Sequence, residues 1–233
     1  MPKIGRALKS VVEIVPQGRY ADRARARPSS PLMNANRRRI FQHLCLNPCS
    51  GIGAIASGTG ISRSSVSWHL EQLVSSGYTE RLQYGRSRVF APVGMVQEHS
   101  IRALSVLAKG NCRSIFDSIL ESPGSDVKAL LGGLDSTEGR LRTCLKELTD
   151  SELVVRLMDG RYARYFPAER FRDIALEMRA KSKGFTRRLM VKLAEEHLKP
   201  EIRDMKRGNT VIVLTVLGQE TVLEIPRRPL PDA

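Results

Sequence analysis

The chain has 233 residues, of which 41% are hydrophobic and 27% charged, and its formal net charge is +14. This length accommodates two small domains, and the strong positive charge favours a polyanionic partner, most commonly nucleic acid. The apolar runs are shorter than the roughly 20 residues of a membrane span, the first residues lack the apolar core of a secretory signal, and four cysteines are too few for a disulfide-rich scaffold. We therefore expect a cytoplasmic protein with reduced thiols.

The basic side chains are concentrated at the N-terminus. Residues 1–39 contain ten basic and two acidic side chains, a net charge of +8. Residues 1–33 precede the first expected helix and are predicted to form a partly flexible arm. We interpret this arm as a phosphate-binding segment rather than a solubilising tail, because cations at this density displace counterions from DNA.

An internal repeat organises the middle of the chain. Identical residues recur at one constant spacing, from the pair Arg38 and Arg113 to the pair Pro92 and Pro167, and we call this the repeat spacing. Such a long register predicts two copies of one unit, at about residues 34–93 and 109–168. We assign them to two domains, residues 34–96 and residues 97–168, and refer to them as the first and second copy.

Each copy is expected to form three helices followed by a β-hairpin. In the first copy, the expected elements are helices over Asn34–Leu46 and Gly51–Ser57, a third helix with Ser62 as its N-cap, and strands over Tyr78–Gln83 and Ser87–Ala91. In the second copy, a helix is expected over Asn111–Glu121. Its hairpin is expected over Leu153–Met158 and Arg161–Phe166, reversed at Asp159-Gly160.

The third helix of the first copy has a polar outward side. Its apolar stripe of Val66, Leu70 and Leu73 faces the core, so Ser64 to Trp68, apart from Val66, should face outward. The run from Ile61 to Leu73, followed by Ser76-Gly77-Tyr78, resembles the recognition helix of archaeal winged-helix regulators related to the ArsR and MarR families. This resemblance implies a winged helix-turn-helix, in which the third helix enters the major groove of DNA.

The remaining chain is predicted to form C-terminal helices and a hairpin over residues 169–225, followed by a flexible tail over residues 226–233. Two helices, one carrying Phe171 to Met178 and one carrying Phe185 to Leu193, should be separated by Gly184. We expect the helices within residues 168–198 to form a homodimer. The hairpin over Thr210–Leu217 and Glu220–Ile225 needs a third strand, for which Ser10–Val15 is a candidate.

The predicted fold is therefore mainly α-helical with small β-hairpin wings, an α+β architecture of two tandem winged helix-turn-helix domains. The second copy carries Thr137-Glu138-Gly139-Arg140 in place of the polar centre of the motif, which favours weaker DNA contact, or a domain kept as a dimerisation or partner surface. The predicted DNA-binding residues are Ser62, Arg63, Ser64, Ser65, Ser67, Trp68, Arg86 and Arg88 of the first copy, and Arg140, Arg142, Thr143, Lys146, Arg161 and Arg164 of the second.

Other chemistries receive less support from the sequence. His43, Cys45 and Cys49 are spaced as possible metal ligands, but Cys45 falls on an apolar helix stripe, so we expect small hydrophobic side chains rather than a metal site. We find no phosphate loop or hydrolase motif, and we predict neither a cofactor nor an enzyme. The predicted function is sequence-specific transcriptional control on double-stranded DNA. The alternatives are a tandem winged-helix scaffold that binds proteins and a non-specific chromatin or nucleic-acid binder.

Overall fold

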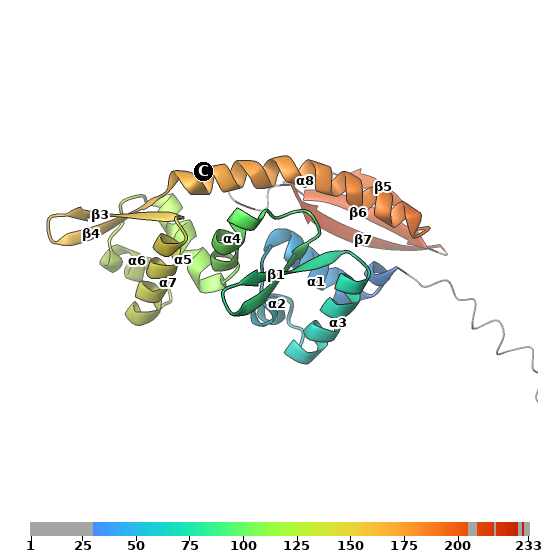
Figure 1. Cartoon of the computed structure of the whole chain (residues 1–233), viewed down its shortest axis with the longest axis horizontal. Coiled ribbons are helices and arrows are strands. Elements are labelled where there is room, and N and C mark those ends of the chain that lie inside the picture. The colour runs from blue at the N-terminus through green and yellow to red at the C-terminus, as the bar shows by residue number, and fades with distance from the viewer. Residues whose placement is uncertain (1–29, 205–208, 217, 228–229, 231–233) are drawn as a thin grey trace, which may run out of the picture.

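The computed structural model describes residues 30–204, 209–216, 218–227 and 230. Residues 1–29 of the predicted arm, which include the strand candidate Ser10–Val15, lie outside the described residues, as do residues 228–229 and 231–233 of the predicted tail. The described chain combines helices with small antiparallel sheets, as predicted for an α+β fold (Figure 1).

The first copy has the predicted order of elements. After the short helix η2 (Pro31–Met33) come α1 (Ala35–Leu46), α2 (Ile52–Thr59), α3 (Arg63–Ser75), β1 (Thr79–Tyr84) and β2 (Ser87–Pro92). The cap at Ser62 is confirmed, since its hydroxyl accepts a hydrogen bond from the backbone N–H of Ser65 at 3.3 Å. Helix α2 extends past the predicted end at Ser57 and stops at Gly60, whose φ of +68° favours glycine.

The second copy repeats this order of elements. It comprises α5 (Gly110–Glu121), α6 (Val127–Gly133), α7 (Glu138–Asp150), β3 (Val154–Asp159) and β4 (Tyr162–Pro167). The repeat extends to backbone pairing, because Ser50 bridges Phe90 in the first copy and Ser125 bridges Tyr165 in the second, again at the repeat spacing. The helices η3 (Glu98–Ser100) and α4 (Ile101–Leu107) connect the copies.

One long helix, α8 (Glu169–Glu195), follows the second copy. The prediction of two helices separated by Gly184 is wrong. The buried side chains Phe171, Ile174, Met178, Ser182, Phe185, Leu189 and Leu193 follow one another at intervals of three or four residues, so a single apolar stripe continues through Gly184. Burial of this stripe on both sides of the glycine outweighs the modest cost of glycine within a helix.

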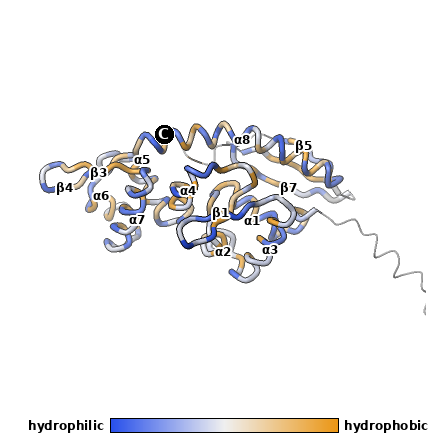
Figure 2. Tube along the Cα trace, in the orientation of Figure 1, coloured by the Kyte–Doolittle hydropathy of each residue, from blue (hydrophilic) through white to orange (hydrophobic). Residues whose placement is uncertain are grey.

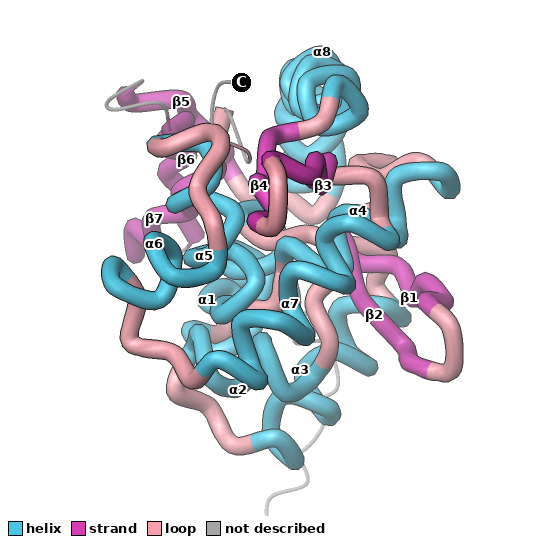
Figure 3. The backbone as a smooth tube through the Cα atoms, turned by 90° about the vertical axis from the view of Figure 1, so that its left-hand side faces the viewer, coloured by secondary structure: helices cyan, strands magenta, loops and turns pink. Residues whose placement is uncertain are grey.

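Helix α8 spans both copies and closes two hydrophobic cores. Phe171, Ile174 and Met178 belong to the core of the second copy, whereas Phe185, Leu189 and Leu193 belong to that of the first. Hydrophobic and hydrophilic residues alternate along α8 (Figure 2), and Figure 3 shows the molecule along the axis of this helix. The stripe is thus covered within the chain, and the homodimer expected through residues 168–198 stays a prediction.

A three-stranded antiparallel sheet ends the described chain. Its strands are β5 (Lys199–Asp204), β6 (Asn209–Val216) and β7 (Gln219–Pro226), in the spatial order β5-β6-β7. The predicted hairpin is confirmed, and among the described residues β5, which was not predicted, adds a third strand to it; the candidate Ser10–Val15 lies outside the described residues. Ile212, Leu214, Leu223 and Ile225 are buried in the core of the first copy, so this sheet completes that core.

A substitution at Gly184 tests whether α8 is one continuous helix, and a substitution at Gly60, after α2, provides the contrast. A Cβ at position 184 would approach only the end of the Arg188 side chain, at 3.3 Å, so we expect Gly184→Ala to raise the free energy of unfolding by about 0.5–1 kcal/mol. Gly60→Ala serves as the contrast, because a positive φ makes alanine unfavourable there by about 1–2 kcal/mol. Urea unfolding measures both, and a loss of stability in Gly184→Ala would contradict the continuous helix.

Candidate nucleic-acid interface

The N-terminal end of α3 presents a cluster of exposed hydroxyl groups. Ser62, Ser64 and Ser65 are exposed, and Ser62 Oγ lies 3.2 Å from Ser64 Oγ and 2.9 Å from Ser65 Oγ. Val66, Leu70 and Leu73 fix the orientation of the helix by packing into the core. Each serine hydroxyl can donate or accept a hydrogen bond, which suits the mixed donor and acceptor pattern of base edges.

Trp68 lies outward on the same helix, with 57% of its surface exposed. The guanidinium carbon of Arg37, from α1, lies 6.0 Å from the centre of the Trp68 ring, within cation–π distance. The predicted outward position of Trp68 is therefore correct, and its ring lies beside Arg37 of the neighbouring helix α1. Arg37 was not among the residues predicted for this surface. Its signal was the run Arg37-Arg38-Arg39, which we counted only as charge.

His69 is buried beneath Trp68, with its ring centre 4.9 Å from that of the tryptophan. Burial, reinforced by the positive charge of Arg37, lowers the pKa of His69 below its ordinary value. The imidazole is therefore neutral at physiological pH.

Three exposed arginines lie on α3 and on the hairpin that follows it. Arg63 begins α3, and Arg86 and Arg88 lie at the tip of the β1–β2 hairpin, which turns at Gly85 with a φ of +57°. Among the described residues, these three arginines have no acidic partner, whereas Arg81 on the same hairpin pairs with Glu71. Within the described part of the chain, the first copy thus has three exposed cations without an acidic partner, one on α3 and two on its hairpin.

The cations predicted to bind DNA in the second copy are mostly neutralised by local acids. Arg142 bonds to Glu138 at 2.6 Å, Lys146 to Asp150 at 2.6 Å, and Arg164 approaches Asp159 at 3.2 Å and Asp126 at 3.8 Å. Arg140 and Arg161 remain exposed, and Arg161 lies over the ring of Tyr162. The Thr143 hydroxyl donates to the carbonyl of Gly139 at 2.9 Å.

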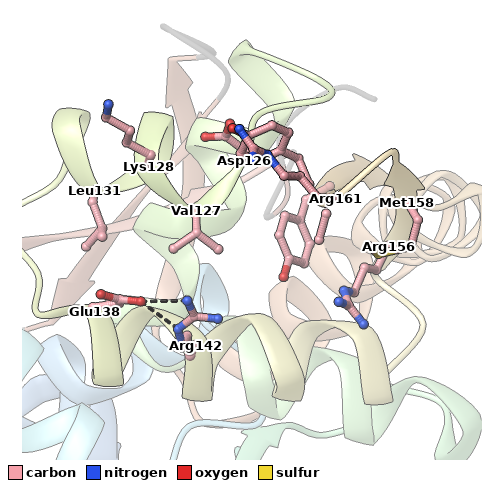
Figure 4. A pocket seen from close by; sticks show the side chains of 12 residues that line it. Asp126, Val127, Lys128, Leu131, Glu138, Arg142, Arg156, Met158 and Arg161 are labelled. Atoms are coloured by element: carbon pink, nitrogen blue, oxygen red, sulfur yellow. Dashed lines mark hydrogen bonds and ion pairs between the residues drawn. The ribbon is translucent and has the colours of Figure 1, made fainter.

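A cavity of about 460 Å³ lies between α6, α7 and the β3–β4 hairpin (Figure 4). At the repeat spacing, Glu138 occupies the position of Arg63, and Met158 that of Gln83. The Glu138–Arg142 pair closes one side, while Met158 and Arg156 come from the hairpin. The side of the second copy that corresponds to the serine cluster is therefore less basic and more apolar.

The cysteines give no support for metal chemistry. Burial raises the pKa of the Cys45 thiol, and it raises that of Cys49 to about 12, so both thiols are protonated at neutral pH. Burial also lowers the pKa of His43. Within the described ranges, no group of three or more His, Cys, Asp or Glu side chains is placed to hold a metal ion.

No helix in the described ranges is long and apolar enough to cross a membrane.

Comparison with known proteins gives a family match within the first copy. The sequence model of the winged helix-turn-helix DNA-binding family matches residues 33–78, which include all of α1, α2 and α3. The chain therefore carries a winged helix-turn-helix DNA-binding domain. This match supports a DNA-binding regulator in general terms. No curated protein sequence matches the chain.

Among solved structures, the chain is similar to the DIP2311 protein from Corynebacterium diphtheriae. The two are 17% identical, and the alignment covers 57% of this chain and 26% of that one, with a TM-score of 0.23. A similarity of this size does not establish a shared fold.

Trp68 allows a direct test of this surface, because it is the single tryptophan of the chain. Its exposed ring should leave water when DNA covers α3, so titration with duplex DNA should shift the emission to shorter wavelength or quench it. The reference is Trp68→Phe with a tryptophan introduced at exposed Leu176 of α8. Emission that changes equally in both proteins would contradict the assignment of α3 as the contact surface.

Proposed function

We propose that this protein is a transcription regulator that binds double-stranded DNA in a sequence-specific manner through its first copy. The observation that carries this proposal is the serine-rich face of α3, bordered by Arg63, Arg86 and Arg88, which have no acidic partner among the described residues. Neutral hydroxyls at the centre suit base edges, and cations at the border suit phosphates. The protein acts without catalysis, in the cytoplasm.

In the proposed complex, the N-terminal part of α3 lies in the major groove. Ser64, Ser65 and Ser67 contact base edges, and Arg63 bonds to a guanine or a phosphate. Arg86 and Arg88 bind the flanking backbone or enter the adjacent minor groove. Trp68 packs on the sugar-phosphate backbone beside Arg37, and the residues of the N-terminal arm add contacts to phosphates that do not depend on sequence.

We further propose that the second copy is a second winged helix-turn-helix domain, as in archaeal tandem regulators related to ArsR and MarR. The shared order of elements and the shared bridges support this. Its contribution to specificity is small, because Glu138 and Asp150 neutralise Arg142 and Lys146, two of the three cations on α7. Arg140 and Arg161 supply phosphate contacts at most.

The salt dependence of binding tests the role of the hairpin arginines. We expect Arg86→Gln plus Arg88→Gln to weaken binding to every duplex and to lower the slope of log affinity against log salt by roughly 0.9 for each lost phosphate contact. The control with the same change in charge is Lys199→Gln plus Arg203→Gln on β5, on the other side of the first copy from α3 (Figure 1). Fluorescence anisotropy measures both, and equal slopes for the two variants would contradict the proposal.

Base discrimination tests the division between the copies. We expect Ser64→Ala plus Ser65→Ala to reduce the preference for a selected duplex over a random one by about tenfold, because hydrogen bonds to base edges are lost. Arg140→Ala plus Arg142→Ala should leave this preference nearly unchanged. Competition gel shifts compare the two pairs. Equal losses would show that α7 recognises bases as α3 does, and failure of the parent chain to bind any duplex would favour the protein-binding scaffold.

A further inference from the structure

The two hairpins of the repeat differ in what covers one of their faces. In the first copy, alternation along β1 places Leu82 and Tyr84 on one face, and the strand register adds Val89 opposite Leu82. Val89 is buried in the core cluster that includes Leu104 of α4, and Leu82 and Tyr84 pack against the same cluster. Helix α4, which leads into the second copy, therefore covers this face of the first hairpin.

The equivalent face of the second hairpin is open. At the repeat spacing, Val155, Leu157 and Tyr162 occupy the positions of Glu80, Leu82 and Ser87. Their exposed fractions are 42%, 53% and 49%. The register pairs Asp159 with Tyr162, Leu157 with Arg164 and Val155 with half-buried Phe166, so these positions share one face. We call five of them the open wing face: Val155, Leu157, Asp159, Tyr162 and Arg164. Tyr162, next to the turn, also borders the cavity on the other face of the hairpin.

No following unit of the described chain covers this face. In the first copy, the chain after the hairpin forms η3 and α4, and α4 packs against β1. After the second hairpin, α8 instead runs back along the molecule toward the first copy (Figure 1). The β3–β4 hairpin consequently projects from the end of the molecule with apolar side chains in water, which is unusual unless such a surface has a partner.

The charges of the open wing face restrict the partner. Asp159 and Arg164 form an ion pair at 3.2 Å, so the face carries one acid and one base and no net charge, although the chain as a whole carries +14. Arg164 also lies 3.8 Å from Asp126 and donates to the carbonyl of Gly124 at 3.4 Å. A neutral apolar face with an exposed carboxylate is a poor surface for DNA phosphates. Two copies of this face, in contrast, can meet without repulsion, and Asp159 of each can face Arg164 of the other at the border.

We infer that the open wing face packs against the same face of a second copy of this chain, forming a two-fold symmetric dimer with Leu157 near its centre. A face that carries both members of an ion pair around an apolar centre is self-complementary, as a two-fold interface requires. This inference goes beyond the proposed function, since self-association can be measured without DNA. Three partly exposed apolar side chains make a small centre, so the dimer should dissociate on dilution.

Sedimentation velocity of the full chain without DNA tests the inference, from low to high micromolar concentration. We expect the parent chain to change from monomer to dimer over this range and Leu157→Glu to raise the dissociation constant by at least about tenfold. Met158→Glu is the matched control, because Met158 is the next residue of β3, is 60% exposed and lies on the opposite face. Circular dichroism should show that both variants keep their helices, since neither side chain is buried.

Cross-linking gives a second readout of the same contact. The native cysteines are all buried, so a cysteine introduced at position 157 should form a disulfide between two chains under mild oxidation, whereas one at position 158 should not. A monomer at every concentration would overturn the inference and leave the face to a different protein. Dissociation of the dimer by Met158→Glu or by Leu176→Glu on α8, with Leu157→Glu unaffected, would also overturn it by placing the contact elsewhere.

Discussion

The apolar stripe of α8 determines how the two copies are joined. Its first half is buried in the core of the second copy and its second half in the core of the first. Full burial of a large aliphatic or aromatic side chain contributes about 1.5–3 kcal/mol, so this packing is strong enough to keep one helix continuous across both copies. At its C-terminal end, the Tyr78 hydroxyl donates to Glu196 at 2.6 Å, and Lys192 lies 4.8 Å from the ring of Tyr78.

This arrangement leaves α3 free to contact a ligand. Helix α8 and the three-stranded sheet close the core of the first copy with buried residues such as Leu189, Ile212 and Leu223, while the serines of α3 stay in water. The second copy has the same elements, but Arg142 and Lys146 on α7 are paired with acids. Helix α8 thus joins two copies that have similar elements but different surfaces. This difference is consistent with base recognition by the first copy and other contacts by the second.

The sequence predicted the local structure well where periodicity and capping coincide. The order of elements in both copies, the cap at Ser62 and the hairpins at Gly85 and Gly160 follow from short-range chemistry. Predictions from local pattern failed where long-range packing decides. Gly184 suggested a break in the helix, but burial of Phe185 and Leu189 keeps the helix intact. Strand β5 was not predicted, because the segment from Lys199 to Asp204 is strongly charged and lacks a clear apolar face.

The candidate site was predictable only in part. The outward position of the serines and of Trp68 follows from helical periodicity in α3. The contact between Arg37 and Trp68 joins two helices, and no sequence spacing reports it. Two ion pairs of the second copy are visible in the sequence, because Glu138 and Arg142 are four residues apart, as are Lys146 and Asp150. These pairs lower the surface charge of α7 more than the sequence-based choice of DNA-binding residues assumed.

Selection of bound sequences from a random pool of DNA duplexes tests the central claim most directly, because the target sequence need not be known in advance. If the serine-rich face of α3 recognises base edges, repeated rounds with the full chain should enrich one sequence motif, and Ser64→Ala plus Ser65→Ala should lose that enrichment while still retaining duplexes at low salt. A pool that remains random after selection with the parent chain would contradict sequence-specific recognition.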